Sequence, residues 1–344
     1  MERGRIQGLD VLRGAAAVAV MLHHHGQYYD VLYPGRSPLA VDLGPGHFGV
    51  ELFFIISGFV ILMTVERRAT VREFVVSRAI RLLPAFLAAL AMASILLMLR
   101  PMHPLEPPTL GEFLANLTMA PSLFGVREVD LPYWTLTYEL VFYALMAMVL
   151  GFGLLRRIEW LGLLAVVAGL AFLLLSDEQS HRRISILLLV RYSNFFLIGI
   201  CLYRLRTGAA RPVTYVALAV ALLVTALGGA ERSFHAPGWI YFLLAVAFTT
   251  LVWFASGRPG RWIATPPLLF LGRISYPLYL VHVAAGFQLI RMMTERGWST
   301  LASTVAAGLL SLAAATAIHY LYERPMQRWL RSYTRTMAPP AQAF

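Results

Sequence analysis

The chain has 344 residues, of which 58% are hydrophobic and only 14% are charged, and its formal net charge is +11. A soluble globular domain carries about 25% charged residues, so a soluble fold of this length would lack the charge to cover its surface. Every basic residue is an arginine, and the arginines form clusters between apolar runs. That pattern is typical of a membrane protein and unlike the one-sided basic face of a nucleic-acid-binding domain, so we expect no nucleic-acid partner.

Ten apolar stretches predict transmembrane helices, each of which needs about 17–25 apolar residues to cross a bilayer. The first stretch is too long for a signal peptide and no small-residue cleavage site follows it, so it is interpreted as a retained span. We therefore expect an all-α integral membrane protein with about ten transmembrane helices. The expected spans are residues 8–28, 48–65, 82–100, 133–155, 159–175, 184–203, 212–229, 239–256, 274–294 and 301–322.

The distribution of arginines predicts the orientation of these helices. If the N-terminus lies inside, the inner segments hold 19 arginines and the outer loops hold 7. The positive-inside rule then places both termini in the cytoplasm. Residues 1–335 are expected to form a single transmembrane domain, and residues 336–344 a short disordered tail. The lone Cys201 excludes a disulfide within the monomer.

The longest outer loop, residues 101–132, contains six prolines. It also contains a short amphipathic stretch near Leu110–Met119. Such a stretch predicts a helix that lies at the membrane interface.

The first span contains an arginine and a histidine in a helical register. Arg13 and His24 are eleven residues apart, so they share one helix face and lie about 16 Å apart along its axis. Ionisable side chains inside a span usually line a site or a pathway. Periodicity alone leaves a functional and a structural role for His24 about equally favoured. His23 and His25 are interpreted as polar residues at the membrane interface.

Two further spans carry charged residues. Arg78 and Arg81 are three residues apart at the inner start of the third span, so they are neighbours on one helix face. Paired guanidinium groups suit phosphate oxygens, although ordinary positive-inside anchoring explains single arginines as well. Glu139 lies about two turns into the fourth span, at a depth comparable with that of His24, where a carboxylate can orient an imidazole. A structural Glu–Arg or Glu–Tyr pair is the alternative.

Other segments stand out less. Tyr133 and Trp134 suit an interfacial aromatic belt. Glu51 lies at the outer start of the second span and Ser57 lies near its middle. The ninth span reads GRISYPLYLVH, in which a proline predicts a kink, and it places His282 near its middle.

Together these segments resemble the membrane acyltransferase-3 family, bacterial O-acyltransferases that modify cell-surface glycans. The resemblance runs in order through LDVLRG…LHHH, GVELFFIISGFVI, RAIRLLP, YWTLTYELVFY, SYPLYLVH and YERP. The family's first-span arginine and histidine fall on Arg13 and His24, its R-x-x-R pair on Arg78 and Arg81, and its fourth-span glutamate on Glu139. The family usually has aspartate where Glu51 stands. WTLTYE replaces its common WSL-x-x-E, a variant associated with exopolysaccharide-modifying members.

The resemblance implies a function and a set of roles. An acyl-CoA donor, most often acetyl-CoA, would present its phosphates to Arg78 and Arg81, and its arm would pass Arg13. His24 would act as general base or acyl carrier towards a hydroxyl of a surface or lipid-linked glycan, supported by Glu139. The expected protein is a multi-pass enzyme of the bacterial inner membrane with no metal and no permanently bound cofactor. Residues expected to line the site are Glu51, Ser57, Tyr133, Trp134, Tyr276 and His282.

Two other classes of function fit the buried charges. In a transporter or flippase, Arg13, Glu139 and His282 would line a translocation path. In a membrane scaffold without chemistry, these residues would only hold helices together.

Overall fold

The computed structural model describes residues 6–37, 39–68, 70–176, 181–227 and 237–336. These residues form helices and loops, with one isolated bridge between Met102 and Leu105 and no strand. The longer helices are α1 (Gln7–His23), α3 (Gly49–Glu66), α4 (Val71–Leu99), α6 (Trp134–Gly151), α7 (Ile158–Leu175), α9 (Ser193–Thr207), α10 (Pro212–Leu227), α11 (Gly238–Ser256), α12 (Pro266–Thr294), α13 (Thr300–Ala317) and α14 (Arg324–Thr336). The all-α expectation is confirmed for the described residues, and the predicted tail lies almost wholly outside them.

Successive helices of the bundle reverse direction. The start of α1 and the ends of α3, α9, α11 and α13 gather at one end, which we call the arginine end. Arg204 on α9 pairs there with Glu66 on α3, and Arg81 on α4 pairs with Glu323, the last residue of the π-helical segment that follows α13. At the opposite end, the histidine end, His25 contacts the carbonyl of His282 at 2.7 Å. Helices that alternate in this way are what repeated crossing of one membrane requires.

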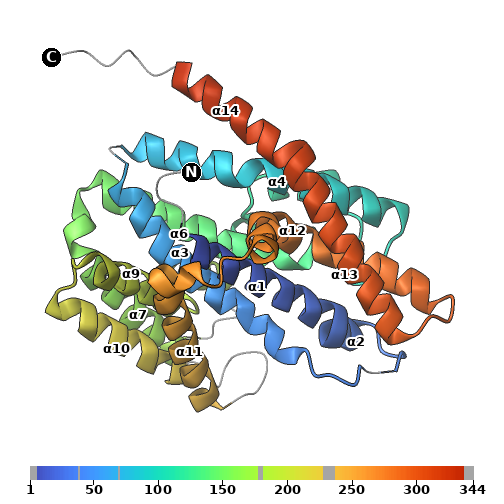
Figure 1. Cartoon of the computed structure of the whole chain (residues 1–344), viewed down its shortest axis with the longest axis horizontal. Helices are drawn as coiled ribbons and strands as arrows, with labels where there is room; N and C mark the ends of the chain where they lie inside the picture. The colour runs from blue at the N-terminus through green and yellow to red at the C-terminus, as the bar shows by residue number, and fades with distance from the viewer. Residues whose placement is uncertain (1–5, 38, 69, 177–180, 228–236, 337–344) are drawn as a thin grey trace.

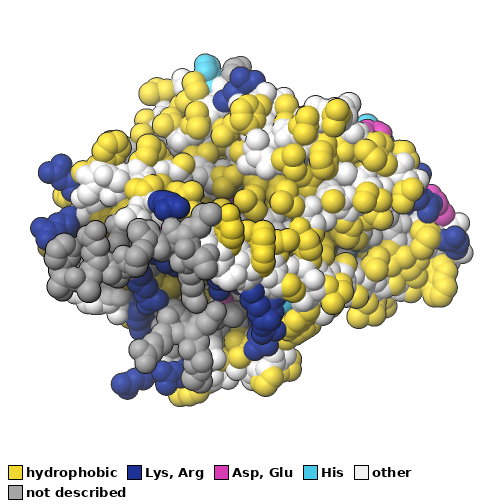
Figure 2. All heavy atoms as spheres, turned by 90° about the horizontal axis from the view of Figure 1, so that it is seen from above, with side chains coloured by type: hydrophobic (Ala, Val, Ile, Leu, Met, Phe, Trp, Pro, Cys, Tyr) yellow, Lys and Arg dark blue, Asp and Glu magenta, His cyan; other side chains and the backbone are white. Residues whose placement is uncertain are grey.

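Seven helical segments of the described chain are long and apolar enough to cross a membrane, and α10 is a shorter apolar helix. These seven correspond to seven of the ten predicted spans. Predicted span 184–203 is interrupted, because α8 (Arg182–Leu187) and α9 are separated by a turn in which Leu189 has a positive φ of 51°. Predicted span 8–28 is carried by α1, whose Asp10, Arg13 and histidines lower its apolar character. Figure 2 shows a face covered mainly by hydrophobic side chains, as lipid contact requires.

The central helices are α1 and α12, which pack in parallel at the middle of the bundle (Figure 1). Small residues allow this contact. A Cβ atom added to Gly272 would lie 2.4 Å from the carbonyl oxygen of Asp10, so only glycine fits there. Close backbone approach through small residues is a common way to pack helices in membranes. The α1–α12 contact continues to the histidine end, where it fixes the candidate site.

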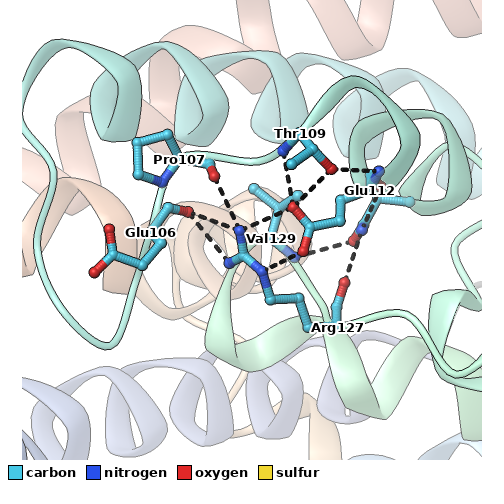
Figure 3. Close-up of polar contacts among 7 residues, drawn as sticks. Glu106, Pro107, Thr109, Glu112, Arg127 and Val129 are labelled. Atoms are coloured by element: carbon cyan, nitrogen blue, oxygen red, sulfur yellow. Dashed lines mark hydrogen bonds and ion pairs between the residues drawn. The ribbon is translucent and has the colours of Figure 1, made fainter.

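The long loop 101–132 is ordered by its own polar contacts (Figure 3). The predicted interfacial helix is present as α5 (Leu110–Asn116), and Thr109 and Glu112 form its capping box. Arg127 donates to Glu112 at 2.6 Å and to the carbonyl oxygen of Pro107 at 3.0 Å. The Arg127 guanidinium, as the main cause, lowers the pKa of Glu112 to about 2. An ion pair therefore fastens the two halves of this loop.

Candidate active site

The histidine end of α1 is kinked. After His23 the chain continues as a π-helical turn, His24–Tyr28, in which Gly26 has φ −90° and ψ −110°. Arg36 donates to the carbonyl oxygens of His25 and Gly26 at 2.7 and 3.2 Å. These bonds satisfy carbonyl groups at the break, where the regular helical pattern is lost. Short π-helical turns are frequent at functional sites, so this kink is the first sign of one.

The kink brings His24 to His282 on α12. His24 Nδ1 lies 2.9 Å from the carbonyl oxygen of Val20 and 3.1 Å from Nε2 of His282, whose own Nδ1 lies 3.1 Å from the carbonyl oxygen of Leu278. A carbonyl only accepts, so Nδ1 carries the hydrogen in both neutral rings. The single Nδ1 hydrogen of His24 is therefore shared between the carbonyl oxygen of Val20 and Nε2 of His282. This arrangement leaves the lone pair of His24 on Nε2. That is the atom through which His24 can act as a base or nucleophile.

The neighbouring histidines are buried. His23 is 3% exposed and His25 is 0% exposed, so their interpretation as polar residues at the membrane interface is wrong. His25 Nε2 donates to the carbonyl oxygen of His282 at 2.7 Å. A Cβ atom on Gly286 would lie 2.1 Å from that nitrogen, so the glycine makes room for the ring. His25 thus ties α1 to α12 beside the His24–His282 contact.

A second cluster of predicted residues lies towards the arginine end. Tyr143 donates to Oε1 of Glu139, and Ser57 donates to the same oxygen at 3.4 Å. Arg13 and Arg78 both interact electrostatically with Glu139 and Tyr143. The cluster therefore joins α1, α3, α4 and α6 around one carboxylate.

Arg81 has a different set of partners from Arg78. Its guanidinium lies 2.7 Å from Oε1 of Glu323 and 5.7 Å from the ring centre of Tyr276. The carboxylate of Glu323 is buried and also contacts His319 at 2.7 Å and Gln327 at 2.9 Å. Arg81 thus anchors the segment that follows α13, whereas Arg78 belongs to the Glu139 cluster.

The structure separates Glu139 from His24. The side chain of Glu139 accepts hydrogen bonds from Ser57 and Tyr143, whereas His282 contacts His24, so the histidine occupies the orienting position expected for the carboxylate. The alternative of a Glu–Tyr pair describes the contact of Glu139 well. Tyr279 lies between the two clusters: its ring centre is 5.8 Å from that of His282, and it interacts electrostatically with Glu139.

The remaining predicted lining residues lie around these clusters. Glu51 is buried and interacts electrostatically with Tyr279. Tyr133 is 1% exposed and packs on Phe86, which does not fit an interfacial belt. Trp134 is half-buried against Tyr192. The aromatic side chains that open α6 therefore face into the bundle.

Comparison with known families decides between the classes of function. The family described as an acyltransferase domain matches residues 6–320, nearly the whole chain. The chain belongs to the acyltransferase-3 family. This membership favours an enzyme over the transporter and scaffold alternatives.

Curated relatives agree with the family. The acyltransferase is 28% identical to "Putative membrane-bound transacylase BcsY" of Komagataeibacter xylinus, over 81% of this chain and 72% of the relative. It is 28% identical to "Exopolysaccharide production protein ExoZ" of Rhizobium meliloti, over 82% of this chain and 90% of the relative. "Putative O-acetyltransferase SACOL0978" of Staphylococcus aureus is 26% identical over 81% of this chain but only 50% of the relative. No solved structure matches the chain.

The sequence did not point to three residues of the candidate site, which are Tyr143, Tyr279 and Arg36. Tyr143 follows Glu139 by four residues, so a helical register could have paired them. Tyr279 precedes His282 by three residues on the same helix and could have been found in the same way. No sequence pattern pointed to Arg36, because it lies in the loop after the first span and its contact with the kink depends on how that loop folds back.

Proposed function

We propose that this membrane acyltransferase transfers an acyl group, most often acetyl, from acyl-CoA to a hydroxyl group of a cell-surface or lipid-linked glycan. The proposal rests above all on the contact between His24 and His282. His282 Nε2 at 3.1 Å and the carbonyl oxygen of Val20 at 2.9 Å share the Nδ1 hydrogen of His24, so the reactive lone pair lies on Nε2 and the ring is held in place. A correctly oriented imidazole is what acyl transfer to a hydroxyl needs from the protein.

The transfer can proceed in one step with His24 as general base. Nε2 takes the proton of the acceptor hydroxyl as its oxygen attacks the thioester carbonyl. The C–S bond breaks, the ester C–O bond forms, and the CoA thiolate takes the proton back from the imidazolium. If His24 is instead an acyl carrier, Nε2 attacks the thioester carbonyl first, the C–S bond breaks and the CoA thiolate leaves. The acceptor hydroxyl then attacks the acyl-imidazole, the C–N bond breaks, the ester C–O bond forms and the hydroxyl proton passes to the thiolate. Both routes use the same nitrogen.

The donor would approach from the arginine end. Arg13 and Arg78 share one cluster with Glu139, and Arg81 lies on the same face of α4 as Arg78. Guanidinium groups bind phosphate oxygens through charge-assisted hydrogen bonds, so the nucleotide part of acyl-CoA fits this end. Glu139 would then hold Arg13 and Arg78 in position, and its link to His24 would run through Tyr279 and His282.

The proposal includes the topology of the enzyme. Ten crossings, by α1, α3, α4, α6, α7, α9, α10, α11, α12 and α13, would place the arginine end in the cytoplasm and the histidine end outside a bacterial inner membrane. The arginine excess in the inner segments and the reversing helices support this orientation. Donor and acceptor would then approach His24 from opposite sides of the membrane.

Purified enzyme and labelled acetyl-CoA test the proposal. Wild type should transfer label to the de-O-acetylated surface polysaccharide of the strain that carries the gene, and His24→Ala should lower this rate by at least 100-fold. His181→Ala is the matched control, because this histidine is exposed and its ring contacts Phe172 of α7. Unchanged transfer by His24→Ala would remove His24 from the mechanism.

A further inference from the structure

A large groove opens at the histidine end, beside the kink that carries His24. Its volume is about 1370 Å³, and its walls come from the residues after the kink, the end of α12 and the start of α13. His24 does not line it, so it is distinct from the reacting histidine. Arg36 connects the two, because it lines the groove and also donates to the carbonyl oxygens of His25 and Gly26.

The groove carries charged groups without a net charge. Its lining includes two arginines, Arg36 and Arg291, and two glutamates, Glu106 and Glu295, whose side chains can all form hydrogen bonds. Arg291 pairs with Glu295 at 2.9 Å, and Arg36 pairs with Asp30. Arginines that already have carboxylate partners are a poor site for a phosphate group. They can still exchange hydrogen bonds with neutral hydroxyl groups of a ligand.

Aromatic side chains supply flat surfaces in the same groove. The rings of Tyr29 and Tyr33 lie 4.8 Å apart, and Trp298 is 57% exposed. Among the described residues, the buried Tyr33 hydroxyl has no hydrogen-bond partner. Tyrosine and tryptophan combine a large apolar face with a polar group, which suits the alternating C–H and O–H surfaces of a sugar.

We propose that this groove docks the saccharide acceptor and holds the sugar units next to the one that receives the acyl group. The inference rests on the proposed function, and it adds the place and the chemistry of acceptor recognition. Pockets for small ligands measure about 300–1,000 Å³, so this groove has room for an extended chain of several sugars. Its neutral lining selects hydroxyl-rich over anionic ligands.

The test measures binding and transfer separately. Oligosaccharides of graded length are prepared from the de-O-acetylated surface polysaccharide of the strain that carries the gene. Their Kd is measured by calorimetry, and their KM by transfer of label from acetyl-CoA. Trp298→Ala removes an aromatic wall of the groove. Trp239→Ala is the matched control, since Trp239 is 62% exposed near the same end but does not line the groove.

We expect Trp298→Ala to raise both Kd and KM about tenfold for long fragments and about twofold for single sugars. Hydrolysis of acetyl-CoA without acceptor should be unchanged, and Trp239→Ala should behave as wild type. If wild type transfers label but Trp298→Ala matches the control, the groove inference is overturned and the proposed function stands. If wild type neither binds nor acylates any fragment, both the groove inference and the proposed function are overturned. A lipid that copurifies with wild type and is lost from Trp298→Ala, with unchanged KM, would assign the groove to lipid instead.

Discussion

His24 and His282 share a hydrogen bond of 3.1 Å across the α1–α12 contact, although 258 residues separate them in the chain. The bond depends on two features at once. The π-helical turn rotates the end of α1, and Arg36 holds the carbonyl groups of that turn. The orientation of the His24 ring therefore depends on contacts from distant parts of the chain as well as on the Val20 carbonyl of its own helix.

Removing His282 should lower turnover without weakening donor binding. His282→Ala takes away one of the two acceptors of the Nδ1 hydrogen of His24 and leaves only the carbonyl oxygen of Val20. The ring is then held less firmly in the orientation that presents Nε2, and we expect kcat to fall by about 10- to 100-fold. The KM for acetyl-CoA should stay within about twofold of the wild-type value, because the proposed donor-binding residues Arg13, Arg78 and Arg81 are unchanged. Steady-state kinetics of purified enzyme measure both constants.

A conservative variant separates positioning from packing. In His282→Gln the amide oxygen can accept the same hydrogen, so this variant should recover a substantial part of kcat, whereas His282→Leu, which keeps volume only, should not. Equal kcat in His282→Leu and wild type would contradict the assignment of His282 as a positioning residue.

Arg78 and Arg81 should differ in what they contribute. A charge-assisted hydrogen bond contributes about 1.5–3 kcal/mol, so Arg78→Ala should raise the Kd for CoA at least tenfold with little change in melting temperature. Arg81→Ala should also lower the melting temperature, because it leaves the buried Glu323 carboxylate without its arginine. Calorimetry and thermal unfolding in detergent distinguish the two effects.

The control for both variants is Arg72→Ala, because Arg72 is an exposed arginine of the same helix, α4. Combining Arg81→Ala with Glu323→Gln should restore part of the lost melting temperature, since the double variant leaves no buried charge unpaired. An unchanged Kd for CoA in the Arg78→Ala, Arg81→Ala double variant would contradict donor binding and would leave membrane anchoring as the role of these arginines.

The sequence predicted the helices better than their contacts. Long apolar runs fixed most spans, because a membrane imposes length and composition on each helix separately. Depth along a helix was less informative: Glu139 and His24 were expected at one level, yet Glu139 contacts Tyr143 and Ser57 in another cluster. The positions of α1, α6 and α12 relative to one another decide such contacts, and hydropathy carries no information on them. The contact of Arg36 could not be predicted from the sequence either, because it depends on a kink at Gly26 that no local sequence pattern indicated.

Glu159 should be a major source of stability at the arginine end. It is fully buried, and it pairs with Arg211 at 2.8 Å and with Arg204 at 3.5 Å. Removing one partner of a buried ion pair costs about 3–5 kcal/mol, so Glu159→Ala should lower the melting temperature in detergent by several degrees. The surface pair of Glu106 with His103 gives the comparison, since Glu106→Ala should cost about 1 kcal/mol or less.

The activity of the folded fraction should be unchanged in Glu159→Ala, because this network lies away from His24. A variant that unfolds at the wild-type temperature would show that Arg204 and Arg211 find other partners.

The loop 101–132 should keep its folded structure in mild acid, because the ion pair between Glu112 and Arg127 persists there. Arg127 lowers the pKa of this carboxyl from 4.5 to about 2, so its contribution to stability is complete above about pH 4.5 and is lost only as pH falls towards 2. Pepsin cleavage within the loop measures this between pH 5 and pH 2. Wild type should remain protected down to about pH 3, whereas Glu112→Gln, which cannot form the ion pair, should be cleaved throughout this range and supplies the correction for the pH dependence of pepsin itself. Loss of wild-type protection already near pH 4.5 would mean that Arg127 does not hold the ionised carboxylate.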